Sequence, residues 1–194
     1  MPTNVNRVMN QMYYKAPTFL IVQDDEGQIA FQREDLMRYS GARGLIASGV
    51  VLRLILAASE DLCPGRIPFR KEFKFRTSFP GDEVRDGIEL VTRAVTQGRF
   101  TLDLSIGPDF APATPAGGRM YFEVAYKDKA MSYVLDPSIF TQQWLEEVVR
   151  HQEGSVSKEA HAKYLEYKYQ ILGMLLSRPE VFTQREPVSI DRFK

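Results

Sequence analysis

The sequence predicts an α+β fold, with a mixed, mainly antiparallel sheet, a long helix buried against it and a C-terminal helical extension. Segments in which apolar and polar residues alternate, as in half-buried strands, recur through the first 138 residues. One apolar run, Gly44 to Leu62, has the length and composition of a helix that is buried on most faces. From Ser138 onward the apolar residues recur at helical spacing. We therefore expect an α+β domain over residues 1–138 and a helical extension over 139–194 that packs on it.

The first predicted elements are a hairpin and a short helix. "FLIVQDDEGQIAF" has apolar runs on both sides of an acidic turn around Asp24 to Gly27, which indicates two antiparallel strands. "REDLMRYSG" has acids near its start and Gly41 at its end, as a short helix would. The long apolar helix follows, and "CPGRIP" ends it because two prolines and a glycine cannot continue a helix.

The middle of the chain predicts strands around a second helix. "FRKEFKFR" alternates strictly, which indicates a half-buried strand, and "PGDEVRDGIELVTRAVTQG" indicates a helix with Ile88, Val91 and Val95 facing the core. "FTLDLSI", "RMYFEVAY" and "AMSYVLDP" alternate again and predict an antiparallel meander. A loop rich in proline and glycine separates the first two of these strands.

The C-terminal region predicts two helices. They are "FTQQWLEEVVR" and, after Gly154, "SVSKEAHAKYLEYKYQILGMLLS". In the second helix Leu165, Tyr169, Leu172 and Leu176 are spaced by four, three and four residues, so this stripe is expected to pack against the domain or against another chain. The tail "REPVSIDRFK" is expected to be poorly ordered.

Composition and charge exclude several classes of partner. The 194 residues contain 25 basic and 25 acidic side chains and no basic block, which argues against nucleic acid. The single cysteine, Cys63, rules out an internal disulfide and an all-cysteine zinc site and favours a reducing, cytoplasmic compartment. The N-terminus lacks the basic-then-apolar order of a signal peptide. The long apolar run carries Arg53 and ends in "SEDL", so we expect a core helix and no membrane partner.

Three stretches resemble the formylmethanofuran dehydrogenase E-like domains. "LMRYSGARGLIASGVVLRL" occupies the place where that family has a Gly-His-x-Cys-Pro turn opening a long buried helix. "RDGIELVTRAVTQGR" resembles the segment with an acidic residue, an Ile-Gln pair, a Thr-Gly-Cys-Thr turn and a Gly-Lys pair. "KDKAMSYVLDPS" resembles the strands with a Gly-Lys-Ala-hydrophobic turn. The resemblance spans residues 32–138.

The resemblance implies a site that has lost its metal ligands. In those relatives the histidine and cysteines form a polar pocket suited to zinc or another soft metal. In this sequence Ala42 stands in place of the histidine, Gly44 in place of the first cysteine and Ala94 in place of the second. We expect no metal, no other cofactor and no metal-dependent activity at this position.

Other residues with chemical potential favour structural roles. His151 and His161 are ten residues apart, unlike the four-residue pair that binds a metal from one helix face, and we expect both to face solvent. Cys63 lies in "CPG", about 20 residues after the family's Cys-Pro position, and is interpreted as part of a helix terminus. The sequence contains no G-x-S-x-G elbow and no glycine-rich nucleotide loop.

The remaining candidate site surrounds Arg43 at the entrance of the long helix. Arg43 and the free N–H groups of a helix N-terminus could bind an anion where the metal ligands would have been. Alternatively, Arg43 pairs with Asp86 or Glu89 and fills the vacated space with an ion pair. The predicted ligand-binding residues are Tyr39, Gly41, Arg43, Gly44, Asp86 and Glu89.

Three hypotheses of function follow. The first is a homodimer that binds a small anionic molecule in the degenerate pocket without metal-dependent catalysis. The second is a structural or partner-binding homodimer that uses the C-terminal helices, because "YLEYKYQILGMLL" is rich in aromatic and aliphatic residues. The third is an enzyme with a relocated metal held by His151, His161, Glu147 or Cys63.

Overall fold

The computed structural model describes residues 17, 19–152 and 156–194. The N-terminal segment, for which the sequence predicts no secretion signal, and the predicted helix break at Gly154 lie outside these residues. The helices are α2 Arg33–Ser40, α3 Leu45–Leu62, α4 Asp82–Thr92, α5 Gln142–Gln152 and α6 Lys158–Ser177, with single 3-10 turns η1 Ala42–Gly44, η2 Arg70–Glu72 and η3 Ile190–Phe193. The strands are β1 Phe19–Asp24, β2 Gly27–Gln32, β3 Phe73–Thr77, β4 Phe100–Leu102, β5 Tyr121–Tyr126, β6 Lys129–Leu135 and β7 Phe182–Pro187.

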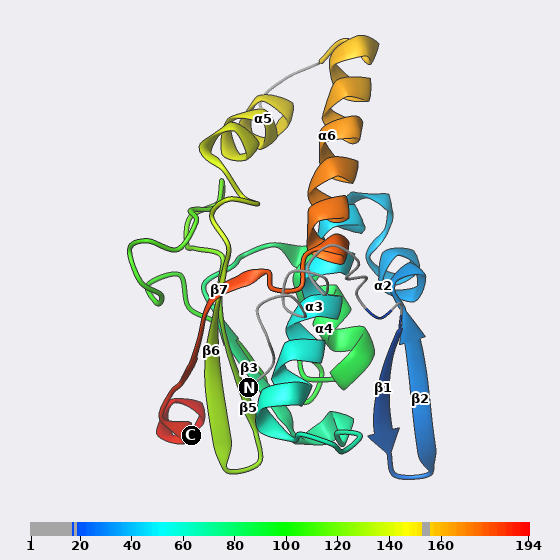
Figure 1. Ribbon diagram of the computed structural model, residues 1–194, viewed down its shortest axis with the longest axis vertical. Coiled ribbons are helices and arrows are strands. Elements are labelled where there is room, and N and C mark those ends of the chain that lie inside the picture. The colour runs from blue at the N-terminus through cyan, green and yellow to red at the C-terminus, as the bar shows by residue number, and fades with distance from the viewer. Residues whose placement is uncertain (1–16, 18, 153–155) are drawn as a thin grey trace, which may run out of the picture.

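The chain folds as predicted into an α+β structure with a mixed, mainly antiparallel sheet. Its five strands have the order β4-β3-β5-β6-β7, and only the β3–β4 pair is parallel. The strands β1 and β2 form a separate antiparallel hairpin, as the acidic turn predicts. In Figure 1, α3 runs between this hairpin and the five-stranded sheet. The long helix is therefore covered on opposite sides by two different sheets.

The helix α3 is the centre of the core. Val51, Leu54 and Ala58 are completely buried, and so are Phe73 and Val124 of the sheet beneath it. By length and composition it is the one helix among the described residues that could cross a membrane, and 67% of that window is buried inside the fold. This burial is that of a core helix, as predicted.

Two glycines let neighbouring helices approach closely. A Cβ built on Gly49 of α3 would lie 2.8 Å from Cδ1 of Leu172 on α6, and a Cβ on Gly87 of α4 would lie 3.0 Å from Cγ2 of Val51. Since real Cβ contacts are longer, larger residues at these two positions would push the helices apart. The glycines thus fix α4 and α6 against α3.

Two predicted elements of the middle region are shorter than expected. The strand predicted from Phe69 begins only at Phe73, because Arg70–Glu72 form η2, where Arg70 pairs with Asp24 at 3.1 Å and donates to the carbonyl of Leu90 at 2.8 Å. The helix predicted to include Val95 ends at Thr92, and Arg93 takes the left-handed conformation with φ 57°.

The predicted antiparallel meander is wrong for its first strand. The segment "FTLDLSI" contributes only the three residues of β4, which pair in parallel with β3 at the edge of the sheet. The other two strands, β5 and β6, form the expected antiparallel hairpin. Alternation alone does not distinguish a parallel edge strand from a meander strand, because both have period two.

The C-terminal tail is ordered, contrary to the prediction. Phe182–Pro187 form β7, which pairs with β6 and completes the sheet. After it, Arg192 of η3 pairs with Glu123, whose side chain is only 1% exposed, and Glu123 also accepts from Arg76 at 3.1 Å and from Tyr121 at 2.8 Å. Burial and this carboxylate raise the pKa of Tyr121 to about 12. Residues 139–194 are therefore not only helical, and the sheet crosses the predicted boundary at residue 138.

The apolar stripe predicted on α6 is only partly the buried face. Leu172 is buried, together with Ile171 and Leu175, against α3. By contrast, Leu165 is 38% and Tyr169 is 61% exposed. The N-terminal half of α6 projects beyond the body of the fold in Figure 1, with α5 beside it.

Candidate functional site

The predicted site residue Arg43 lies in η1, at the start of α3, with its side chain 85% exposed. Its Nε is 3.5 Å from Oε1 of Glu83 near the start of α4. Its backbone carbonyl accepts a hydrogen bond of 3.0 Å from Nζ of Lys168 on α6. The carboxylate that Arg43 reaches is therefore Glu83, which differs from the predicted pairing with Asp86 or Glu89.

Lys168 and Tyr164 of α6 also belong to this region, although no sequence pattern singled them out. Lys168 is buried, its Nζ lies 5.7 Å from the centre of the Tyr164 ring, and burial lowers the pKa of Lys168 and raises that of Tyr164. The one feature of the sequence that marks Lys168 is its position between aromatic residues in "YLEYKYQIL". Its partner, Arg43, is 125 positions away, and spacing does not reveal such a contact.

The other predicted residues at this end make a closely packed turn. Gly41 has φ 82°, which favours glycine, and Tyr39 on α2 is 51% exposed. Gly44 is buried, and a Cβ built on it would overlap the hydroxyl oxygen of Ser40 and lie 3.6 Å from Cβ of Glu83. The space next to Gly44 is thus filled by a neighbouring side chain.

The two predicted carboxylates of α4 have different surroundings. Burial and the charge of Asp82 raise the pKa of Asp86. Glu89 is buried and accepts hydrogen bonds from the backbone of Val95 at 2.8 Å and of Thr96 at 3.1 Å, and from the Thr96 hydroxyl. Burial opposes ionisation of Glu89, but these hydrogen bonds outweigh it and lower the pKa. Glu89 therefore holds the turn that ends α4 and does not face Arg43.

The three positions where the family resemblance implies metal ligands do not meet. Ala42 and Gly44 lie before α3, and Gly44 faces Glu83 near the start of α4. Ala94 comes after the C-terminal end of that 11-residue helix. A rise of 1.5 Å per residue separates the two ends of α4 by about 16 Å, far more than two ligands of one metal.

Of the residues proposed for a relocated metal, the structure brings the two histidines together but places no third ligand from the described residues with them. The rings of His151 and His161 lie 6.2 Å apart, and His151 stacks on Tyr164 at 3.9 Å. The Glu147 carboxylate pairs with Arg150 at 2.8 Å, while Cys63 follows the far end of α3. No group of three or more His, Cys, Asp or Glu side chains within the described part of the chain is placed to hold a metal.

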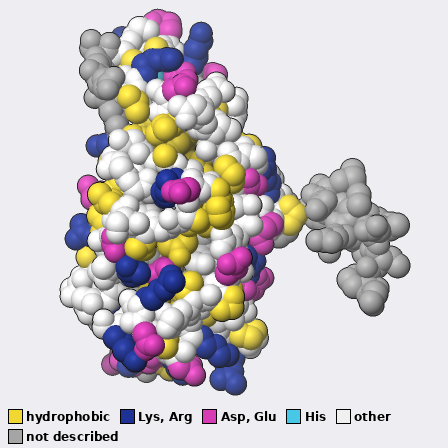
Figure 2. Space-filling view, turned by 90° about the vertical axis from the view of Figure 1, so that its left-hand side faces the viewer, with side chains coloured by type: hydrophobic (Ala, Val, Ile, Leu, Met, Phe, Trp, Pro, Cys, Tyr) yellow, Lys and Arg dark blue, Asp and Glu magenta, His cyan; other side chains and the backbone are white. Residues whose placement is uncertain are grey.

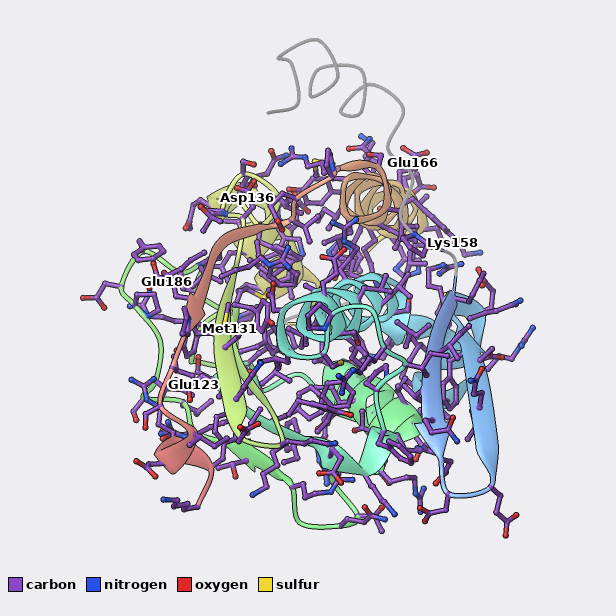
Figure 3. All side chains as sticks on the ribbon, turned by 60° about the horizontal axis from the view of Figure 1, so that its bottom comes forward. Glu123, Met131, Asp136, Lys158, Glu166 and Glu186 are labelled. Carbon is purple, nitrogen blue, oxygen red and sulfur yellow. The ribbon has the colours of Figure 1, made fainter. Side chains whose placement is uncertain are left out.

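Two hollows lie at the opposite, C-terminal end of α3, which faces the viewer in Figure 3 between the sheet and the β1–β2 hairpin. The smaller, of about 380 Å³, is called the cationic hollow and is lined by Leu62, Cys63, Pro64, Arg66, Ile67, Phe69, Tyr126, Lys127, Asp128 and Lys129. The larger, of about 650 Å³, is called the large hollow and is lined by Pro17, Arg53, Leu56, Ala57, Ser59, Glu60, Cys63, Gly65, Arg66, Ile67, Pro179, Glu180, Phe182 and Arg185. The loop that follows α3 lines both.

The cationic hollow has an excess of positive charge. Arg66, Lys127 and Lys129 line it with a single carboxylate, Asp128. None of the three cations forms an ion pair within residues 19–152 and 156–194, and Lys127 lies over the ring of Tyr126 at 5.7 Å. These cations come from the loop after α3 and from the turn of the β5–β6 hairpin, two segments about 60 residues apart.

The thiol of Cys63 stands between the two hollows. Its Sγ donates a weak hydrogen bond to the carbonyl of Ser59 at 3.3 Å, and burial raises its pKa. Burial therefore favours the neutral thiol form of Cys63, which does not repel an anion. Its interpretation as part of a helix terminus agrees with its position directly after α3.

The comparisons with known proteins assign the chain to no group. No protein-family model matches it, and no curated protein matches it.

Proposed function

We propose that this protein binds a small anionic molecule in the cationic hollow, without metal-dependent catalysis. The observation that carries the proposal is the convergence of Arg66, Lys127 and Lys129, all without an ion-pair partner in the described residues, on one concave surface with an apolar floor. Cations that are not neutralised by the protein are available to a ligand, and a concave surface removes part of that ligand from water.

The apolar part of the lining favours a carboxylate that carries an apolar group. Leu62 is buried, while Ile67 and Phe69 are 39% and 37% exposed, so the loop presents hydrocarbon surface beside the charges. Nucleic acid fits the molecule less well, because acidic and basic side chains are intermingled on the face shown in Figure 2. The cytoplasmic location and the kinship with the formylmethanofuran dehydrogenase E-like domains stay predictions from the sequence.

Isothermal titration with benzoate and with inorganic phosphate tests this proposal. The triple variant Arg66→Ala, Lys127→Ala, Lys129→Ala should weaken the binding of benzoate at least tenfold, because it removes every unpaired cation of the hollow. The matched control is Arg43→Ala, an exposed cation at the other end of α3, which should leave binding unchanged. If Arg43→Ala abolishes binding and the triple variant does not, the site lies at the start of α3. If the wild-type protein binds neither anion, the proposal is wrong.

A second candidate function is self-association through α6. Its specific observation is the exposure of Leu165 and Tyr169, which lie four residues apart near the middle of this helix and form an apolar stripe without a partner in the described residues. Truncation after Ser138 cannot test it, because that deletion also removes β7 and the buried face of α6. Sedimentation velocity of Tyr169→Lys should instead show a monomer where the wild-type chain shows a dimer, and a monomeric wild-type chain would rule the idea out.

A further inference from the structure

The two hollows differ in how their charged side chains are paired. In the large hollow Arg185 pairs with Asp61 at 2.7 Å, with Glu180 at 3.0 Å and with Glu60 at 3.3 Å. Arg53 is buried, and its guanidinium donates to the backbone carbonyl groups of residues 178 and 179 at 3.0 and 2.7 Å. Apart from Arg66, which lines both hollows, the cations of the large hollow thus have partners within the protein, whereas Arg66, Lys127 and Lys129 of the cationic hollow form no ion pair in the described residues.

Besides these charged side chains, the large hollow has apolar walls. Leu56 and Ala57 of α3 form one wall, and Phe182 at the start of β7 forms another. Ala57 and Phe182 are 7% and 3% exposed, so they belong to the edge of the hydrophobic core. Hydrocarbon placed against such walls is removed from water, which is favourable by about 0.8 kcal/mol for each buried CH₂ group.

The two hollows meet at one short loop. Cys63, Arg66 and Ile67 line both of them, and within this loop Gly65 has φ 72°, a left-handed backbone conformation that favours glycine. The side chains of Cys63 and Ile67 at this junction are uncharged. Of the described residues that line both hollows, the one charged side chain that an apolar chain passes is Arg66, whose guanidinium attracts the anionic end of the ligand.

From this arrangement we propose that the two hollows are one bipartite site for an amphipathic monocarboxylate. The carboxylate lies among Arg66, Lys127 and Lys129, and the hydrocarbon chain crosses the loop after α3 into the large hollow against Leu56 and Ala57. This inference rests on the proposed function for the position of the ligand's carboxylate, and it adds the chemical class of the ligand. It requires that affinity rise with chain length.

Titration of the full chain with butanoate, hexanoate and dodecanoate, each as free monomer in solution, tests the inference. Dodecanoate should bind at least tenfold more tightly than hexanoate, because its additional CH₂ groups reach the large hollow. Ala57→Trp should weaken dodecanoate at least tenfold and leave benzoate unchanged. Leu56→Asn, at a position that is only partly buried, should weaken dodecanoate severalfold with the same selectivity. The matched control is Leu165→Asn, an exposed leucine on α6, which should change neither ligand.

The outcomes separate this inference from the proposed function. If benzoate binds but affinity does not rise with chain length, the bipartite site is wrong and the anion site stands. If the triple cation variant leaves benzoate binding intact, the proposed function fails first. Co-sedimentation with vesicles of phosphatidylcholine and phosphatidylserine (4:1) tests the other possible source of an amphipathic anion, which is a lipid surface. Binding to vesicles that dodecanoate does not compete would overturn the inference in favour of a lipid surface.

Discussion

The two ends of α3 differ in how tightly they are packed and in whether their charged side chains have partners. At its start, Gly44 leaves just enough room for Ser40, and Arg43 and Lys168 make contacts to Glu83 and to a backbone carbonyl. At its far end, cations line a hollow without ion-pair partners in the described residues. Polar groups that the fold uses internally stabilise the fold, whereas groups left unpaired on a concave surface are available for binding. The difference predicts that substitutions at the start of α3 and along α4 cost stability and that those at its far end cost binding.

Replacing Glu89 should give the largest loss of stability. Glu89→Ala leaves the Val95 and Thr96 donors without their acceptor, and this should lower the free energy of unfolding by about 2 kcal/mol at pH 7. Urea denaturation followed by circular dichroism measures it. The control Glu83→Ala, which breaks one 3.5 Å ion pair with an exposed arginine, should cost less than about 1 kcal/mol. Equal losses for the two variants would contradict the assignment.

The same residue predicts a dependence on pH. The pKa of Glu89 is lower in the folded chain than its ordinary value of 4.5, so its contribution is fully present above pH 4.5. It is lost as the pH falls below 4.5 and through the folded-state pKa. The difference in stability between the wild-type protein and Glu89→Ala should therefore shrink with acidification in that window. A difference that stays constant down to the acid transition would show that ionised Glu89 is not what holds the turn.

Introducing a cysteine at the position where the family resemblance predicts one should give the next largest effect. Gly44→Cys places a Cβ where the Ser40 hydroxyl lies, and we expect it to destabilise the fold by about 1–2 kcal/mol. The double variant Gly44→Cys, Ser40→Ala should recover at least half of this loss, because the alanine removes the overlapping oxygen. Thermal and urea unfolding of the two variants measure this. An unchanged stability for Gly44→Cys would mean that the start of α3 has the room that a metal ligand needs.

Removing the unpaired cations should give the smallest effect on stability. The triple variant of Arg66, Lys127 and Lys129 loses three exposed side chains without ion pairs in the described residues, so the free energy of unfolding should stay within about 0.5 kcal/mol of wild type. Together with the loss of benzoate binding, this result would sharpen the contrast between the two ends of α3. A large destabilisation would show that these cations serve the fold.

Local patterns predicted most of the fold. The acidic turn at Asp24 to Gly27, the apolar run of α3 and the alternation in β5 and β6 each indicate an element from neighbouring residues alone. What they did not indicate depends on distant partners. The tail is ordered because Arg192 finds Glu123, 69 positions away, and β7 finds β6. No local pattern in "REPVSIDRFK" reports either contact.

The candidate site was harder to predict than the fold, for the same reason. Arg43 stood out because a charged residue interrupts an apolar segment, and that signal located the start of α3. The hollow at its other end is built from Arg66 in a loop and Lys127 and Lys129 in a hairpin turn. A charged residue in a loop or a hairpin turn is common, so none of the three stood out in the sequence. Only the pairing of β5 with β6 and the course of the loop after α3 bring them together.

The strand β7 has a consequence for how the chain is made. The strand β6, synthesised about 50 residues earlier, depends on β7 for one of its two neighbours. Until Phe182–Pro187 have left the ribosome, the nascent sheet has an open edge along β6, the kind of edge to which other nascent chains attach. Emergence of β7 is therefore the step that covers β6 and completes the five-stranded sheet, with β7 as its edge strand, and a translational pause shortly before it would prolong the exposure of β6.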